Sequence, residues 1–437
     1  MENKKREAFV DDLSHDGRGV LRLDGKVYFV PGALPGEKIE FEPFRKRRGQ
    51  FVGRLLSVLS ASPHRVQPAC EYFGTCGGCT LQHLAPNQQL AYKEKTLLGN
   101  LSRIGRVEPE NLLPALSGEN WHYRRKARPG VKYVPKKGGV LVGFRELGNS
   151  YLTSLRQCKT LEQRLSDLLD PLHQVIAQTS GFQQVPQLEF AAGDNAIAVV
   201  LRHLQPLNSK DLDLLTKFAQ HHQVQLFLQS GGLDTINPLW PEDPIPLNYL
   251  LPDFDLSIEF SPSDFIQVNG TINQSLIQQA IDFLDLKAPD SVLDLFCGLG
   301  NFTLPVARSG VPVTGVEGEH RLVKKGRANA AKNNLDNVKF IEMNLAGESI
   351  LELGSSNYNK LLLDPPRSGA DEVLKHLVPK IRPQKIVYVS CNPATLARDA
   401  ETLVHGYGYR FTHAGAIDMF PHTAHIESMG VFESGDV

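Results

Sequence analysis

An apolar strand that runs directly into a glycine turn and a helix limits the folds that this chain can adopt. Residues 291–301 read Ser-Val-Leu-Asp-Leu-Phe-Cys-Gly-Leu-Gly-Asn, and a helical stretch follows over 302–308. Further apolar strands are expected at 311–316, 338–341, 360–363 and 386–389. Strands that alternate with helical segments predict a parallel sheet covered by helices. The C-terminal part is therefore expected to be an α/β, Rossmann-like domain.

Polar residues follow several of these strands, at the edge where open α/β sheets bind ligands. Glu317 ends the second strand, 19 positions after Gly298, and can accept both hydroxyls of a ribose. The turn lacks the full Gly-x-Gly-x-x-Gly spacing of dinucleotide sites, and its Asp294 and Cys-Gly-x-Gly form are typical of S-adenosylmethionine sites. The predicted cofactor residues are Phe265, Gln267, Asp294, Phe296, Gly298, Asn301, Glu317, Asn344 and Asp364.

Cys391 ends the strand expected at 386–389, and the turn residues Asn392-Pro393 follow it. Glu427 comes 36 residues later, in a polar run that also contains His422 and His425. A thiol nucleophile and a general base are what methylation of pyrimidine carbon 5 needs. We interpret Cys297 as a small buried side chain and the two histidines as structural hydrogen-bonding groups.

Charge is distributed unevenly along the chain, although the net charge is only −1. Residues 1–150 carry 25 Lys+Arg and 15 Asp+Glu, a balance of +10, whereas the remainder carries 22 and 33, a balance of −11. This asymmetry favours a polyanionic partner for the first part. The RNA-binding candidates are Arg45, Arg47, Arg48, Arg124, Arg125, Lys126 and Arg128, the last four beside Trp121 and Tyr123. No run approaches the roughly 20 apolar residues of a membrane span, so we expect no membrane partner and a cytoplasmic location.

The N-terminal part combines short strands with cysteines. Over 7–58, apolar runs separated by Asp-Gly, Pro-Gly and Gly-Arg-Gly turns predict a small OB-like barrel, a fold that often binds single-stranded nucleic acid. Cys70, Cys76 and Cys79 follow in a glycine-rich loop, and Cys158 lies further along. One close cysteine pair with two more distant cysteines suits an iron–sulfur cubane better than the paired hairpins of a zinc site. Zinc, or thiols that bind no metal, are the alternatives.

The chain resembles the RNA uracil-C5-methyltransferase family along nearly its whole length. The motifs that carry the resemblance are SPSDFIQVN, DLFCGLGNFTL, LLLDPPRSGA, VYVSCNPATLARD and DMFPHTAHIESM. The cysteine loop and the barrel are similar to the branch that has a [4Fe-4S] cluster and a TRAM domain and acts on 23S ribosomal RNA. This resemblance implies a TRAM barrel at 1–60, an α+β central domain with the cluster at 61–262, and a methyltransferase domain at 263–437.

The same resemblance implies the chemistry. Cys391 is the nucleophile that attacks carbon 6 of uracil, Glu427 removes the carbon-5 proton, and Asp364 contacts the uracil edge. Cys70, Cys76, Cys79 and Cys158 hold the cluster, and uracil 1939 of 23S ribosomal RNA is the expected target. Another 23S uridine or a tRNA uridine is the alternative target, and no obligate protein partner is evident. An amino-methyltransferase, suggested by Asp364-Pro365-Pro366, and a non-catalytic RNA-binding protein are the other functions considered.

Overall fold

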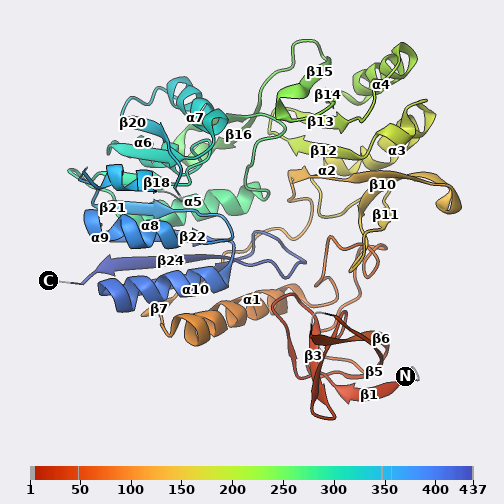
Figure 1. Cartoon of the computed structure of the whole chain (residues 1–437), viewed down its shortest axis with the longest axis horizontal. Coiled ribbons are helices and arrows are strands. Elements are labelled where there is room, and N and C mark those ends of the chain that lie inside the picture. Colours follow the sequence, from red (N-terminus) through yellow and green to blue (C-terminus); the bar gives the residue numbers. More distant parts are fainter. Residues whose placement is uncertain (1–4, 48, 346–347, 356, 436–437) are drawn as a thin grey trace.

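The computed structural model describes residues 5–47, 49–345, 348–355 and 357–435. Among these residues, three sheets and one hairpin form three units, with the N-terminal unit at one corner of the molecule and helix α1 (Pro86–Asn100) leading from it to the C-terminal unit (Figure 1). Among the described residues, no helix has the length and apolar character that crossing a membrane requires.

The N-terminal unit is a curled six-stranded sheet, with strand order β1-β5-β6-β4-β3-β2. Asp24 and Gly25, both at positive φ, make the tight turn between β3 and β4, as expected for a two-residue hairpin loop. Its small core contains Leu21, Ile39 and Phe41. Because the hydrogen-bonded order is open at β1 and β2, this unit is a half-barrel where the sequence predicted a barrel. The strands are β1 (Arg6–Phe9), β2 (Asp12–Leu13), β3 (Gly19–Leu23), β4 (Lys26–Val30), β5 (Lys38–Arg47) and β6 (Gln50–Ser60).

The central unit is a mixed sheet ordered β11-β10-β9-β12-β13-β14-β15, with β8 beside β12. Helices α3 and α4 pack together against it, and the core between them is aliphatic. Residues 163–178 form two helices, α2 and α3, separated by a short break. The elements are β8 (Lys126–Ala127), β9 (Gly130–Val134), β10 (Gly139–Arg145), β11 (Leu152–Ser154), α2 (Gln163–Ser166), α3 (Leu169–Gln178), β12 (Gln187–Ala192), β13 (Ile197–Arg202), α4 (Ser209–His222), β14 (Gln225–Gln229) and β15 (Ile236–Trp240).

The C-terminal unit has the order β20-β19-β18-β21-β22-β24-β23-β7, parallel from β20 to β22 and antiparallel at β24 and β23. The five strands expected between 291 and 390 are all present. Its elements are α5 (Gly270–Leu284), β18 (Val292–Leu295), α6 (Thr303–Arg308), β19 (Val313–Glu317), α7 (His320–Lys332), β20 (Val338–Glu342), β21 (Lys360–Leu363), α8 (Asp371–His376), α9 (Val378–Ile381), β22 (Lys385–Ser390), α10 (Pro393–Glu401), β23 (Tyr409–Ile417) and β24 (Glu427–Ser434).

Alternate residues of the strands supply two cores, one on each face of this sheet. In β22, Ile386 and Tyr388 pack toward α1, α8 and α10, whereas Val387 and Val389 pack toward α5 and α6. Continuous apolar runs are expected for strands buried on both faces. The two cores therefore hold the carboxyl edge of the sheet in place from both faces.

Two segments of the predicted central block pack with the C-terminal unit. Helix α1 (Pro86–Asn100) lies against α10 and β23, and β7 (Asn111–Leu112) pairs with β23. The hairpin of β16 (Leu247–Leu251) and β17 (Leu256–Phe260) shares a core with α5 and α7. The C-terminal unit is thus built from more of the chain than the predicted limits 263–437.

Candidate active site

The strand register brings three functional groups to one edge of the sheet. Ser390 of β22 pairs with Ser428 of β24, so Cys391 and Glu427 are the next residues along this antiparallel pair. Leu363 of β21 pairs with Tyr388, which places Asp364 at the same edge. The site therefore arises from strand ends that lie up to 63 positions apart in the sequence.

Cys391 is half-buried and lies in a cavity of about 590 Å³, which Arg367, Asn392 and His425 also line. Asn392 caps α10, because its Oδ1 accepts a hydrogen bond from the N–H of Ala394, and this fixes the end of the strand. Burial, and then the carboxylates of Glu427 and Asp364, raise the pKa of the Cys391 thiol to about 11, whereas Arg367 opposes the rise.

Glu427 is the more deeply buried carboxyl of the site, at 4% exposure. Its Oε2 has no hydrogen-bond partner among the residues that the structure describes. Burial, with the nearby charge of Asp364, raises the pKa of Glu427 to about 8, and burial raises the pKa of Asp364 to about 7. A carboxyl group whose pKa lies near neutrality and whose oxygen is unpaired is suited to proton transfer.

Arg367 is a site residue that the sequence analysis did not assign. It follows Asp364-Pro365-Pro366 and is exposed in the cavity of Cys391, with its Nη2 3.2 Å from His425 Nδ1. Its backbone oxygen accepts a hydrogen bond from the side chain of Asn392. The sequence did offer a signal for Arg367, because it lies three residues after Asp364 in the LLLDPPRSGA motif. A cation at that position opposes the negative charge of the Asp364 carboxylate.

The loop that precedes Glu427 is held by the segment around the cysteines. The backbone oxygen of His422 accepts hydrogen bonds from the N–H groups of Thr80 and Leu81, and Thr80 Oγ1 accepts one from Ala424 N–H. His422 also stacks on Trp121, with ring centroids 3.8 Å apart. These contacts agree with the interpretation of His422 as structural.

A buried ion pair supports the same loop from α1. Lys93 Nζ lies 2.5 Å from Asp418 Oδ1 and donates to the backbone oxygen of Phe420, and the Lys93 side chain is only 1% exposed. Gln89, also on α1, accepts from His422 N–H and pairs with His422 Nδ1. The entry to β24, and with it Glu427, is thus fixed by residues more than 300 positions away in the chain.

The glycine turn after β18 forms a second polar region at the same edge. Asp294 is fully buried, accepts a hydrogen bond from Thr303 Oγ1, and its Oδ1 has no partner among the described residues. Burial raises the pKa of Asp294 to about 8. The carboxylate of Glu317 accepts from the N–H groups of Gly298 and Glu319 at 3.1 and 3.0 Å. Phe296 and Gly298 take positive φ here, so the backbone turns sharply beneath both carboxyls.

The other predicted cofactor residues differ in how exposed they are and in whether their side chains already bond within the protein. Phe265 is 72% exposed and Gln267 partly exposed, on the same side of a segment whose alternate residues are buried. The Asn301 side chain exchanges hydrogen bonds with Asn273 and accepts one from Tyr249 Oη, so it is engaged within the protein. Asn344 follows β20, as expected. Cys297 is buried at 5% exposure, in agreement with its interpretation as a core residue.

The four predicted cluster cysteines come together. Cys70, Cys76, Cys79 and Cys158 all line one cavity of about 410 Å³, and all are free thiols. Burial raises the pKa of Cys76 to about 11 and that of Cys79 to about 12. No group of three or more His, Cys, Asp or Glu among the described residues is arranged to hold a single metal ion. The cavity shares Gly77, Gly78, Thr423 and His425 with the cavity of Cys391.

The predicted RNA-binding cations whose side chains the structure describes do not form one exposed cluster. Lys126 is nearly buried and paired with Glu189, and Arg125 pairs with Asp194. Arg124 donates to the backbone of Lys126 and lies over the ring of Phe420. Arg128 is 63% exposed. Arg48 lies outside the described residues, as do the side chains of Arg45 and Arg47.

Comparison with known proteins identifies the family of this chain and several relatives. A profile of the tRNA (Uracil-5-)-methyltransferase family matches residues 154–434. The chain is 49% identical over 428 residues to the 23S rRNA (uracil(1939)-C(5))-methyltransferase RlmD of Xanthomonas campestris, covering 97% of this chain and 96% of that protein. It is 48% identical to the RlmD of Thiobacillus denitrificans, covering 96% and 98%.

Among solved structures, the Pyrococcus abyssi tRNA (uracil-54, C5)-methyltransferase in complex with S-adenosyl-L-homocysteine has the same fold, with a TM-score of 0.75. The sequence identity is 24%, and the match covers 98% of this chain and all of that one. This likeness shows a shared fold, and at the carboxyl edge of its sheet this chain carries the thiol of Cys391. The chain belongs to the tRNA (uracil-5-)-methyltransferase family, which confirms the resemblance seen in its motifs.

Proposed function

We propose that this protein methylates carbon 5 of one uracil in 23S ribosomal RNA, with S-adenosylmethionine as methyl donor. The observation that carries the proposal is the strand register: Cys391 and Glu427 are the residues next to the Ser390–Ser428 pair, and Asp364 follows Leu363 at the same edge of the sheet. Relatives that are 48–49% identical over nearly the whole chain carry the name 23S rRNA (uracil(1939)-C(5))-methyltransferase, which favours uracil 1939 as the target. Work on ribosomal RNA fits a cytoplasmic protein.

The residues at the glycine turn fit S-adenosylmethionine, which carries a positive sulfonium and an ammonium group. Asp294 offers an unpartnered buried oxygen, and the carboxylates of Glu317 and Asp364 add negative charge. The positive groups of the cofactor would stabilise the ionised form of these buried carboxylates. Phe265 offers an exposed apolar face and Gln267 a polar group on the same side. The bound cofactor supplies an electrophilic methyl group.

The remaining steps belong to the protein's own residues. The Cys391 thiolate adds to carbon 6 of uracil, and the electrons of the carbon 5–carbon 6 double bond move toward oxygen 4, so carbon 5 becomes nucleophilic and accepts the methyl group. Glu427 then takes the proton from carbon 5. The electrons of that carbon–hydrogen bond reform the double bond, and the carbon 6–sulfur bond breaks, which restores the Cys391 thiolate. Because the base must leave its stack to reach Cys391, the RNA is locally opened.

We further propose that the four cysteines hold one [4Fe-4S] cluster. Four thiols around one cavity, with no disulfide among the described residues, provide the donors that a cubane takes. The raised thiol pKa values of Cys76 and Cys79 mean that a positive centre is needed to keep these groups ionised. The sequence spacing, with one close cysteine pair and two more distant cysteines, suits a cubane better than the paired hairpins of a zinc site. Its role is to hold the cysteine loop, which supports the loop before Glu427.

RNA contacts are proposed for the half-barrel, which we take as a TRAM domain, and for Arg128. Arg128 keeps 63% of its side chain exposed, and the cavity of Cys391 extends to His15 and Asp16 of the half-barrel. An exposed arginine pairs with phosphate more readily than a buried one. The half-barrel and the cysteine loop are therefore the parts expected to select the RNA shape.

The test is a mass-spectrometric map of 23S ribosomal RNA and tRNA after incubation with anaerobically purified protein and labelled S-adenosylmethionine. We expect label in one 5-methyluridine of 23S ribosomal RNA, at position 1939, and no label with Cys391→Ala. Label in tRNA alone would replace the substrate and keep the chemistry. Transfer that survives Cys391→Ala would favour an amino-methyltransferase, and absence of transfer to any RNA would refute the enzymatic proposal.

A further inference from the structure

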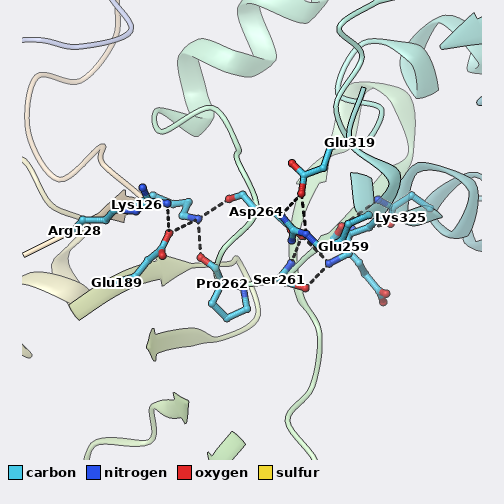
Figure 2. Close-up of polar contacts among 11 residues, drawn as sticks. Lys126, Arg128, Glu189, Glu259, Ser261, Pro262, Asp264, Glu319 and Lys325 are labelled. Atoms are coloured by element: carbon cyan, nitrogen blue, oxygen red, sulfur yellow. Dashed lines mark hydrogen bonds and ion pairs between the residues drawn. The ribbon is translucent and has the colours of Figure 1, made fainter. Parts of the chain in front are cut away.

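A polar network joins the central unit to the segment that carries Phe265 and Gln267 (Figure 2). Lys126 of β8 points its ammonium at this segment and donates to the backbone oxygens of Pro262 and Asp264 at 2.6 and 2.5 Å. The Lys126 side chain is 12% exposed, and its charge is paired with Glu189 of β12 at 3.3 Å. Two hydrogen bonds from one nearly buried ammonium fix the path of the backbone immediately before Phe265.

Helix α7 holds the same segment from the opposite side. The side chain of Asp264 is fully buried, lies 2.6 Å from Lys325 Nζ, and pairs with Arg321. Asp264 Oδ2 also accepts from the N–H of Ser261, which closes a turn of four residues. Burial of a carboxylate is tolerated here because two cations and a backbone donor compensate its charge.

The network continues to the residue expected to bind the ribose. Arg321 pairs with Glu319 at 2.8 Å, and the N–H of Glu319 donates to the carboxylate of Glu317. Phe265 and Gln267 on one side, and Glu317 on the other, are therefore linked through Asp264, Arg321 and Glu319. Lys126 is the member of this network that comes from the central unit.

We infer that Lys126 is a positioning residue for the cofactor site: it holds the 261–267 segment so that Phe265 and Gln267 face the cofactor. This inference rests on the proposed function, since it takes those residues as cofactor ligands. It replaces the expectation that Lys126 contacts RNA, because its donors are used within the protein. It also makes the central unit part of the cofactor site.

The test is the affinity for S-adenosylhomocysteine, measured by calorimetry on the full chain without RNA. Lys126→Met keeps most of the side-chain volume and removes the ammonium group that donates to Pro262 and Asp264. Glu189 keeps Arg128 as an ion-pair partner at 3.2 Å. We expect binding weakened about 10-fold to 100-fold, the range seen when a group that orients a ligand is lost. Because Cys391 and Glu427 lie on other strands, we expect kcat at saturating cofactor to stay within about twofold and KM for S-adenosylmethionine to rise.

Lys332→Met is the matched control. Lys332 lies on α7 and pairs with Glu259, and among the residues that the structure describes it makes no hydrogen bond or ion pair with the 261–267 segment. The cofactor affinity of this variant should therefore be unchanged. Asp264→Asn is a second variant: it keeps an acceptor for Ser261 N–H, removes the charge, and should weaken cofactor binding as Lys126→Met does. Melting temperatures without cofactor show whether each variant is folded.

Each other outcome has a distinct meaning. If the unmodified protein does not bind S-adenosylhomocysteine, the proposed function fails. If it binds and folded Lys126→Met binds equally well, the inference about Lys126 is wrong. A variant that binds the cofactor normally but has a raised, salt-dependent KM for RNA would restore Lys126 as an RNA contact.

Discussion

The sharpest test of the active-site electrostatics is Glu427→Gln, which keeps the shape of the side chain and removes its charge. Burial contributes most to the raised pKa of Cys391, and the Glu427 carboxylate is the next contribution. Removing it should lower the thiol pKa and increase the thiolate fraction. Because the pKa of Glu427 is about 8, roughly 1% of it is ionised at pH 6 and about 90% at pH 9. The thiolate fraction of Cys391 should therefore differ between the variant and the unmodified protein only when the pH exceeds about 8.

The size of the difference follows from the strand geometry. Facing positions of an antiparallel pair lie about 5 Å apart, and two unit charges at that distance interact by about 3 kcal/mol at an effective dielectric constant of 20. Since Cys391 is half-exposed, solvent screening reduces this value, so we expect alkylation by iodoacetamide to be about tenfold faster in the variant at pH 9. At pH 6 the two rates should agree within about twofold.

Peptide mass spectrometry after timed alkylation measures Cys391 separately from the other cysteines. Glu433→Gln is the control, because it removes a charge from the same strand at the end remote from Cys391 and should leave the rate unchanged. With RNA and cofactor, Glu427→Gln should transfer one methyl group and then remain covalently attached, with turnover reduced about 10²- to 10⁴-fold. Equal alkylation rates at pH 9, or turnover at the unmodified rate, would refute this account of Glu427.

Three further outcomes are expected. In the unmodified protein, kcat should rise between pH 6 and 8, because Glu427 must lose its proton to complete turnover after methyl transfer; a kcat profile that is flat between pH 6 and 8 would contradict this. Lys93→Met should destabilise the fold by about 3–5 kcal/mol in thermal unfolding, because it leaves Asp418 buried without its cation, and adding Asp418→Leu should recover part of the loss. Cys79→Ser should remove bound iron and labile sulfide in chemical analysis and abolish visible absorbance, whereas Cys297→Ser should leave all three unchanged; retention of iron by Cys79→Ser would remove Cys79 from the cluster.

Much of the site could be predicted because its residues stand at the ends of apolar strands. Asp364 and Cys391 follow β21 and β22 directly, so parallel pairing alone places them at one edge. The sequence did not predict which unit the segments before β18 would pack with. Helix α1 and strand β7 join the C-terminal sheet although about 180 residues separate them from β18, and local periodicity carries no information on such long-range pairing.

The amino-acid sequence alone identified the parts of the chemistry: a thiol, a carboxyl base, a glycine turn with acidic residues, three cysteines in the basic N-terminal part and a fourth at position 158. Which charged side chains are exposed became known from the packing of the folded chain. Lys126 and Arg128 are two positions apart, yet one is nearly buried against backbone oxygens and the other is exposed. The pKa of Glu427 was also beyond the sequence, because it depends on burial and on the charge of Asp364 from another strand. Burial and long-range pairing are properties of the packed chain, and they turn a list of reactive residues into a site.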